Sequence, residues 1–330
     1  MTGLDGTRFT PASFAPIAVA TRSGIDESLH HGAAVVIDAD GAVVTSTGDP
    51  ELLIHPRSAL KPFQADAMVA AGLELSNRLL SVVAASHSGE PEHQAGVLEI
   101  LDRYDVSVGD LANTAARPYG AVAREAARSA GVAPSPLQQN CSGKHAGMLA
   151  TCRINGWAID SYLDPDHPLQ VAIADHIDLL SGRDGGSVAD IGVDGCGAPT
   201  HVMPLVDVAR SLGAMFRSRS GVVAAMSAEP FMAAGSDRDV TLWMGAVAGL
   251  VAKEGAAGVM VVGLSDGRAA ALKIADGSDD VRRAVTPELL RRLDVDVDVD
   301  VLHRSVLDRV AVPVLGHGVP VGSVLPLPWT

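Results

Sequence analysis

Segments with the pattern of β-strands lie at both ends of the chain, and the long stretch between them has the pattern of helices. Near the N-terminus, two apolar runs within residues 33–45 meet at an Asp-Gly pair, which is typical of a two-residue hairpin turn. Near the C-terminus, two similar runs within residues 310–324 meet at a Gly-His-Gly turn. The pattern predicts one antiparallel sheet built from both chain ends, with a helical lobe inserted between them.

Between these ribbons, apolar residues recur at helical spacing and glycines follow several helical segments. We expect helices at residues 59–71, 91–104, 121–130, 142–154, 167–180 and 200–212, followed by a long helix that ends near residue 252. Strands return at residues 258–264 and 269–274. We therefore expect one two-lobed domain, with a sheet lobe at about residues 15–57 and 256–330 and a helical lobe at about residues 58–255.

The charge of the chain excludes some partners. Acidic residues number 39 against 25 basic ones, so the formal net charge of −14 repels phosphate backbones and anionic membrane surfaces. The apolar stretch 241–264 is long enough to span a bilayer, but Lys253 and Glu254 near its middle favour a buried helix followed by a strand. Three cysteines and an N-terminus without a basic and apolar leader predict a reduced, cytoplasmic protein with no nucleic-acid or membrane partner.

Lysine is scarce in this chain: of the 25 basic residues only four are lysine, at positions 61, 144, 253 and 273. A general bias toward arginine explains the scarcity. Arginine stays protonated in proteins, whereas lysine can lose its proton and act as a base, a nucleophile or, rarely, a metal ligand. The lysines that remain are therefore candidates for roles that need a neutral amine.

A serine and a lysine stand three residues apart where the helical region begins, in RSALKPFQ. This spacing puts the Ser58 hydroxyl and the Lys61 amine on one helix face, where a neutral amine can take the serine proton and leave a nucleophile. Such a pair also arises by chance, with Ser58 serving only as a helix cap. A second serine, Ser86, lies in ASHSGE, a polar turn that either displays catalytic groups or begins a helix.

Two glycine-rich turns each contain a cysteine, Cys141 in NCSGKHAG and Cys196 in DGCGAPT. We expect a helix after each turn, whose N-terminal dipole would favour a thiolate and suit the cysteine to nucleophilic attack or metal binding. Cys141 and Lys144 have the spacing of a metal knuckle, and Cys196 is a plausible third ligand. Small buried cysteines in tight turns explain these segments equally well. Cys152, in the middle of a helical segment, is expected in the core.

Four segments resemble, in order, those of the rhizobial-type (class 3) L-asparaginases, the asparaginase II family: RSALKPFQ, ASHSGE, NCSGKHAGML with the later LDPDHPLQ, and DGCGAPT. The resemblance extends over about residues 19–324. It implies an α/β (α+β) fold similar to serine β-lactamases and penicillin-binding proteins. It also implies a homodimer that hydrolyses L-asparagine to L-aspartate and ammonia.

The resemblance further implies roles for individual residues. The implied catalytic residues form two tandems, Ser58 with Lys61 and Ser86 with Lys253. The implied ligands of a zinc ion are Cys141, Lys144 and Cys196. The expected substrate-binding residues are Arg57, His87, Glu90 and Asp194.

In the mechanism that we expect, one serine attacks the side-chain amide of asparagine and its lysine carries the proton to the departing ammonia. Ser58 with Lys61 has the better local geometry, while Ser86 with Lys253 is either the nucleophilic pair or a proton relay. A zinc ion held by three protein groups keeps an open position and would assist substrate binding.

Other functions stay open on the sequence. A β-lactamase or transpeptidase would need a Lys-Thr-Gly-like triplet on a late strand, and the segment that starts at Lys273 does not match it. A cysteine hydrolase would use Cys141 with His145 or His201 as its base. An amidohydrolase acting on another small amide, or a zinc-dependent amino-acid-binding protein without catalysis, also fits these motifs.

Residues 294–301 alternate valine and aspartate. Alternation of this kind matches a half-buried strand with one charged face. We favour an acidic connector between a helix that ends at Leu293 and the final strands.

Overall fold

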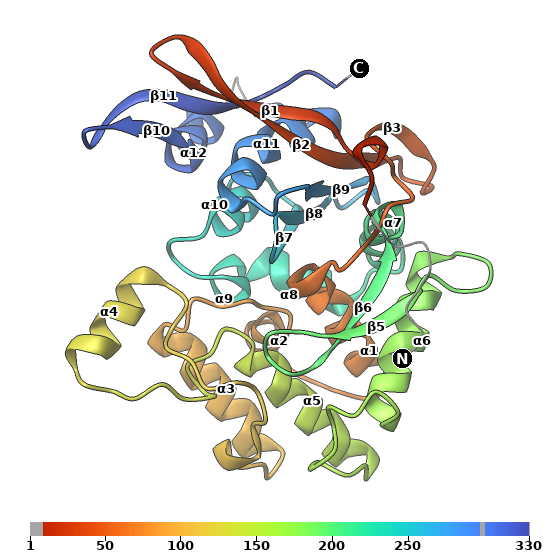
Figure 1. Ribbon diagram of the computed structural model, residues 1–330. Coiled ribbons are helices and arrows are strands. Elements are labelled where there is room, and N and C mark those ends of the chain that lie inside the picture. Colours follow the sequence, from red (N-terminus) through yellow and green to blue (C-terminus); the bar gives the residue numbers. More distant parts are fainter. Residues whose placement is uncertain (1–8, 298–300, 330) are drawn as a thin grey trace.

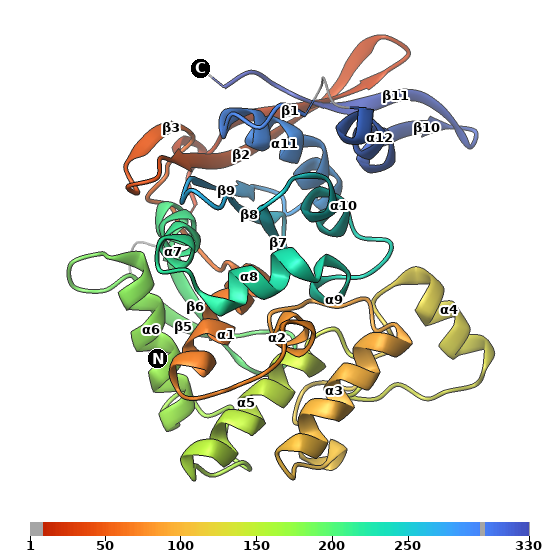
Figure 2. The ribbon, with the colours of Figure 1, turned by 180° about the vertical axis from the view of Figure 1, so that it is seen from behind.

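The chain forms a sheet lobe and a helical lobe, which lie in the upper and lower parts of Figure 1 and Figure 2. The computed structural model describes residues 9–297 and 301–329. Within these ranges, no helix combines the length and the apolarity needed to cross a bilayer.

A large antiparallel sheet contains strands from both ends of the chain, as the sequence predicts. Its strands are β1 (Ala15–Arg22), β2 (Ile25–Ile37), β3 (Val43–Thr47), β7 (Val251–Gly255), β8 (Val259–Gly263), β9 (Ala269–Ile274), β10 (Pro313–Gly316) and β11 (Val319–Pro326). The strand order is β10-β11-β1-β2-β9-β8-β7, with β3 beside β2. Val19 of β1 pairs with Leu325 of β11, which joins the two chain ends. The expected hairpin between β2 and β3 and the ribbon of β10 and β11 are both confirmed.

The helices connect and cover this sheet. They are α1 (Lys61–Ala70), α2 (Asn77–Val83), α3 (Pro91–Arg103), α4 (Ala121–Ser129), α5 (Ser142–Asn155), α6 (Pro168–Ser181), α7 (Leu205–Arg217), α8 (Gly221–Ala228), α9 (Pro230–Ala233), α10 (Asp239–Ala246), α11 (Asp279–Arg292) and α12 (Val301–Val310). Short 3-10 helices lie at η1 (Pro11–Ser13), η2 (Arg57–Leu60) and η3 (Val108–Asp110).

The central strands are buried because helices cover both faces of the sheet. On β8, Met260 lies against Arg282 of α11, and a side chain at Gly263 would meet Leu212 of α7. Residues an odd number apart on a strand point to opposite faces, so α11 and α7 cover opposite sides. Residues of β7, β8 and β9 are all buried, and this explains the nearly continuous apolar sequences of β8 and β9, whereas β7 carries Lys253 and Glu254.

In the helical lobe, α5 is surrounded by other helices and is buried over most of its length. It packs very closely on α2, because a Cβ at Gly143 would lie 2.2 Å from the Val82 carbonyl oxygen. This close approach brings the residues at the start of α5 next to the turn that follows α2. A second, smaller sheet in the order β4-β6-β5 borders this lobe and contains β4 (Leu53–Ile54), β5 (Asp190–Val193) and β6 (Pro199–Pro204).

Two expected helices are wrong in part. Residues 199–204 form β6 instead of the start of a helix, because they pair with β4 and β5 and are fully buried there. The long helix expected to end near residue 252 ends at Ala246, and the sheet resumes at Val251 after a turn in which Gly249 has φ +75°. The sheet therefore includes β7, which the sequence reading had placed in the helical lobe.

The segment of alternating valine and aspartate connects α11 to α12, in agreement with the connector that we favoured. Residues 294–297 form a turn and irregular chain and not a strand. Residues 298–300 of this segment, like the N-terminal residues 1–8, lie outside the described ranges.

Candidate active site

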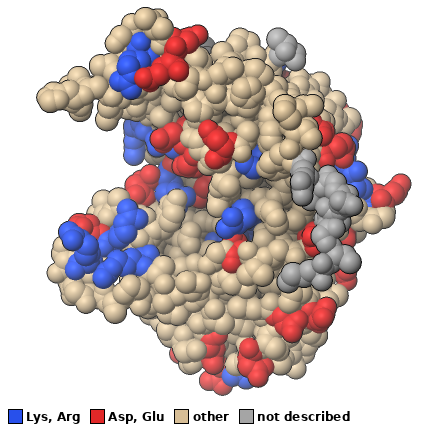
Figure 3. Space-filling view, viewed as in Figure 1, with Lys and Arg blue, Asp and Glu red and all other residues tan. Residues whose placement is uncertain are grey.

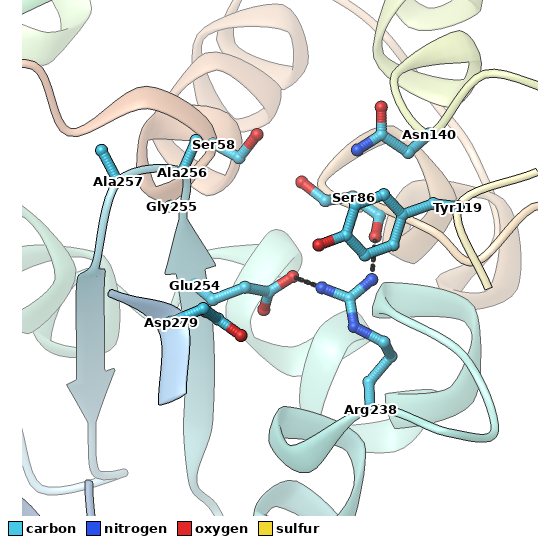
Figure 4. A pocket seen from close by; sticks show the side chains of 10 residues that line it. All are labelled: Ser58, Ser86, Tyr119, Asn140, Arg238, Glu254, Gly255, Ala256, Ala257 and Asp279. Atoms are coloured by element: carbon cyan, nitrogen blue, oxygen red, sulfur yellow. Dashed lines mark hydrogen bonds and ion pairs between the residues drawn. The ribbon is translucent and has the colours of Figure 1, made fainter. Parts of the chain in front are cut away.

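A cavity of about 240 Å³ opens where the end of β7 meets η2 and the turn after α2. The residues that line it are Ser58, Ser86, Tyr119, Asn140, Arg238, Glu254, Gly255, Ala256, Ala257 and Asp279 (Figure 4). The lobes fit closely at this point, since a Cβ at Gly255 would lie 2.2 Å from the Pro56 carbonyl oxygen. Glycine at this position therefore allows β7 to border η2, in which Ser58 is the second residue.

Ser86 is held in place by Lys61. The Lys61 amine donates to Ser86 Oγ at 3.0 Å, to the Ala85 carbonyl at 2.7 Å and to the Asn140 carbonyl at 3.3 Å. It also donates to Cys141 Sγ at 3.1 Å. Ser86 is 4% exposed and Lys61 is 1% exposed. The first tandem is thus rearranged in the structure, because the lysine of RSALKPFQ is hydrogen-bonded to Ser86 and not to Ser58.

Ser58 is half-buried and its hydroxyl forms no hydrogen bond among the residues that the structure describes. In Figure 4 the hydroxyls of Ser58 and Ser86 both point into the space between them. The preceding residue, Arg57, has φ +54°, a left-handed conformation that is costly for a residue with a Cβ and is often found at functional sites. This sharp turn presents Ser58 to the cavity.

Three charged side chains, Arg238, Glu254 and Lys253, lie next to one another beside the cavity, with the anion between the two cations. Arg238 donates to the Ser86 carbonyl at 3.0 Å and also pairs with the Glu254 carboxylate, while the Tyr119 ring lies over its guanidinium. Lys253 donates to the Glu254 carbonyl at 2.7 Å, and its amine lies 3.2 Å from Glu254 Oε1. The bonds of Lys253 that involve described residues all go to Glu254, so the structure does not bring Lys253 to Ser86.

Burial and neighbouring charges shift the pKa values of Lys253 and Glu254. It lowers the pKa of Lys253 to about 8, although Glu254 acts in the opposite direction. Burial opposes ionisation of Glu254, but Lys253 and Arg238 outweigh it and lower the pKa of that carboxyl to about 2. Glu254 is therefore a permanent anion between two cationic groups.

The three implied zinc ligands lie together beneath the cavity. Lys144 Nζ lies 3.4 Å from Cys196 Sγ, and the Cys141 thiol is hydrogen-bonded to Cys196. All three residues are buried, and the cysteines form no disulfide. The hydrogen bond from Cys141 and the charge of Lys144 lower the pKa of Cys196, while the same hydrogen bond and burial raise the pKa of Cys141. The pair therefore carries its thiolate on Cys196.

The helix dipole is not the cause of this lowered pKa. Cys141 is the N-cap of α5 as expected, but Cys196 lies in the turn between β5 and β6, so no helix follows it. The expectation of a helix after Cys196 is wrong for the same reason as the helix at residues 200–212.

The donor set fits zinc. Two sulfur atoms and one amine nitrogen converge, which are donor types that zinc accepts, and the pKa of Cys196 is lowered. Burial opposes the charge of Lys144, but Cys196 and Cys141 raise its pKa, so its amine would have to release a proton to bind the metal. Within the described ranges, no group of three or more His, Cys, Asp or Glu side chains is placed to hold a metal. A zinc site here consequently depends on Lys144 as its third ligand.

The expected substrate-binding residues divide into two groups. Arg57 and Asp194 are brought together in an ion pair of 2.6 Å beside Ser58. His87 is fully buried, with Nε2 3.0 Å from Ser142 Oγ, and does not line the cavity. Glu90 caps α3 and accepts a hydrogen bond from the Ser236 amide, so it supports the loop that leads to Arg238.

Several cavity residues were missed by the sequence reading. Tyr119 stands in no motif that we recognised, Asn140 begins the motif NCSGKHAG but was given no role there, and Arg238 is one of many arginines. Lys253 lies on β7, in a segment that the sequence predicted to be helical. Lys273 has a different place, since its amine donates to the carbonyl of Ala257 at 2.8 Å and holds the turn after β7.

The model of the L-asparaginase II family matches residues 18–326. No curated protein matches the sequence.

Two solved structures are similar at low identity. A crystal structure of Mglu in its tris and glutamate form has 14% identity and a TM-score of 0.43, over 82% of this chain and 60% of that chain. A β-lactamase from Mycobacterium bovis has 15% identity and a TM-score of 0.41, over 80% of this chain and 95% of that chain. The chain thus spans about three fifths of the length of Mglu.

Proposed function

The chain belongs to the L-asparaginase II family, and from this membership and the geometry of the cavity we propose that it hydrolyses L-asparagine to L-aspartate and ammonia. The observation that carries the proposal is the hydrogen bond between Lys61 and Ser86 at the edge of a cavity that also exposes Ser58. A serine nucleophile needs a base within hydrogen-bond reach, directly or through one intervening group.

In the proposed reaction Ser58 attacks the amide carbon of the asparagine side chain. Its oxygen is unpartnered among the described residues and open to the cavity, so it is free to approach the substrate. The Ser58 proton passes to the Ser86 oxygen, and the Ser86 proton passes to Lys61, which acts as the base of the relay. When the carbon–nitrogen bond breaks, the same path returns a proton to the departing ammonia.

Water then cleaves the ester between Ser58 and the aspartyl group. The water loses its proton to the Ser86 and Lys61 relay while its oxygen attacks the ester carbon. The bond to Ser58 breaks, Ser58 recovers its proton, and L-aspartate leaves. The bond from Arg238 to the Ser86 carbonyl keeps Ser86 in position throughout.

We propose that the α-carboxylate and α-ammonium of asparagine bind at Arg57 and Asp194 beside Ser58, and that they replace the single ion pair that these two side chains form with each other. Cys141, Lys144 and Cys196 would hold the zinc ion. When bound, zinc supplies an open coordination position that orients the substrate.

A cysteine hydrolase is less well supported. Its nucleophile would be Cys141, but the pKa of this thiol is raised and its sulfur is engaged by Cys196 and Lys61. The two histidines proposed as its base are also poorly suited, since burial lowers the pKa of His145 and that of His201 to about 4.

The test is release of ammonia and aspartate from L-asparagine by the purified protein. We expect Ser58→Ala to lower kcat by about 10³-fold or more and Ser86→Ala by about 10²-fold. Ser81→Ala is the matched control, because Ser81 is also buried and hydrogen-bonded but lies away from the cavity on α2. Binding of asparagine without turnover would favour the zinc-dependent binding protein. Turnover of a different amide, with none of asparagine, would show that asparagine is not the substrate.

The resemblance of the motifs to class 3 L-asparaginases also supports a homodimer. Light scattering should then give twice the chain mass of 33.9 kDa. A mass equal to one chain would refute the homodimer but would leave the proposed hydrolysis of asparagine unaffected.

A further inference from the structure

A second cavity of about 370 Å³ adjoins the first one on the side away from the serines. The two cavities share Tyr119, Arg238 and Asp279. Figure 3 shows a hollow between the basic side chains over α4 and the upper part of the molecule, with charged residues along its edge. The active site is therefore the inner end of a longer cleft.

The carboxylates of the second cavity are already engaged. Asp239 accepts two hydrogen bonds from Arg282, and Asp279 accepts a third from the same guanidinium. Asp237 accepts a hydrogen bond from the Ser88 hydroxyl at 2.9 Å. Arg282, with all of these partners, is likewise satisfied. None of these groups is left to receive a charged ligand.

Two cations at the edge of the cavity have weak partners. Among the described residues, Arg124 on α4 donates only to the Tyr119 carbonyl, at 2.9 Å. Arg283 on α11 has only an ion pair of 3.8 Å with Asp280. Their guanidinium groups are presented from the two sides of the cleft, one from each lobe. A carboxylate is the group that such a pair is suited to bind.

The orientation of the substrate decides which part of it reaches these arginines, and this step rests on the proposed function. Arg57 and Asp194, which bind the aspartyl half, line neither cavity. With the aspartyl half held at Arg57 and Asp194, next to Ser58, the leaving nitrogen would lie on the other side of the reacting carbon, toward Arg238. A group attached to the amide nitrogen would therefore extend into the second cavity.

We propose that this enzyme also cleaves β-amides of aspartate whose leaving amine carries a carboxylate, that is, β-aspartyl dipeptides, with Arg124 and Arg283 binding that carboxylate. The chemistry is unchanged. The Ser58 oxygen bonds to the β-carbonyl carbon, the carbon–nitrogen bond breaks, and the nitrogen keeps the electron pair and takes a proton through Ser86. Water then releases aspartate, so the products are aspartate and a free amino acid.

The experiment measures aspartate release from L-asparagine, β-aspartylglycine and the β-methylamide of aspartate, because all three yield the same product. We expect turnover of β-aspartylglycine. Arg124→Gln and Arg283→Gln should each raise its KM by about ten-fold, the loss expected for one charge-assisted hydrogen bond, and leave the KM for asparagine unchanged. Arg128→Gln is the matched control, since Arg128 is an exposed arginine on the same helix that does not line the cavity.

Two results would overturn the inference. If asparagine is hydrolysed and β-aspartylglycine is not, the second cavity does not receive the leaving group, while the proposed asparaginase activity stands. If the arginine variants raise the KM values of β-aspartylglycine and the methylamide equally, the arginines do not recognise the carboxylate. Absence of aspartate from all three substrates would refute the proposed function together with this inference.

Discussion

The two serines of the cavity differ in how their turns are held. Ser86 is buried in its turn. Its hydroxyl accepts a hydrogen bond from Lys61, and its carbonyl accepts one from Arg238. Ser58 follows the left-handed residue Arg57 in η2, is half-buried, and has a hydroxyl with no partner among the described residues. A group that relays protons must hold a fixed distance to its base, whereas a nucleophile must be free to approach carbon. The two turns meet these two different requirements.

The largest effect should come from the base that serves both serines. We expect Lys61→Arg to lower kcat by about 10³-fold, because arginine keeps the positive charge but cannot accept a proton. Lys273→Arg is the matched control, since Lys273 is also a buried lysine that donates to carbonyl oxygens. Steady-state kinetics with circular dichroism of each variant measures this. Equal losses in the two variants would show that replacing any buried lysine is harmful, and the base assignment would fail.

A smaller effect on kcat is expected from changes to the proposed zinc ligands Cys141, Lys144 and Cys196. Among the described residues, their link to the base is the hydrogen bond from Lys61 to Cys141. Cys196→Ser should remove most of the bound zinc, as measured by metal analysis of the purified protein, because serine is a poor zinc ligand at neutral pH. The KM for asparagine should rise by about ten-fold while kcat stays within a factor of a few. Cys152→Ser, a cysteine in the core of α5, is the control and should keep its zinc. A fall in kcat as large as that of Lys61→Arg would place the metal in the chemistry.

The smallest effect on activity is expected at Lys253, which is bonded to Glu254 and to neither serine. Its role should instead be visible in stability. The pKa of Lys253 is about 8 in the folded protein and 10.5 ordinarily, so the unfolded chain binds more protons between these values. The free energy of unfolding should therefore rise with pH through this window, by about 1.4 kcal/mol for each pKa unit at most.

Lys253→Met should remove this rise, and urea unfolding of both proteins from pH 7 to pH 10 would measure the difference. The comparison of the two curves isolates Lys253 from other groups that titrate in the same range. Parallel curves would mean that the folded protein does not shift the Lys253 pKa. A loss of kcat near 10³-fold in this variant would restore the second tandem implied by the sequence resemblance.

The parts of the fold that local sequence determines could be predicted. The Asp-Gly hairpin, the Gly-His-Gly ribbon and most helix boundaries depend on residues close to one another in the chain, and the structure has them. Strands β6 and β7 could not be predicted, because both are fully buried and yet contain polar or charged residues, so neither shows the alternation of a half-buried strand nor the continuous apolar run of a buried one.

The site divides in the same way. Motifs identified Ser58, Lys61 and Ser86, but the sequence spacing suggested that Lys61 would serve Ser58. The actual partner depends on how α5 and the turn after α2 pack around Lys61, which involves residues far apart in the chain. Arg238 and Tyr119 reach the cavity through long-range packing alone, so no local pattern marks them.

The most direct test of the difference between the two serines is mass spectrometry of the acyl-enzyme. Rapid acid quench during turnover of L-asparagine, followed by peptide mapping, would locate the aspartyl group. The account predicts the added mass on the peptide that contains Ser58 and its absence in Ser58→Ala. Aspartyl modification of Ser86 in the wild-type enzyme would contradict the account, since Ser86 would then be the nucleophile and Lys61 its direct base.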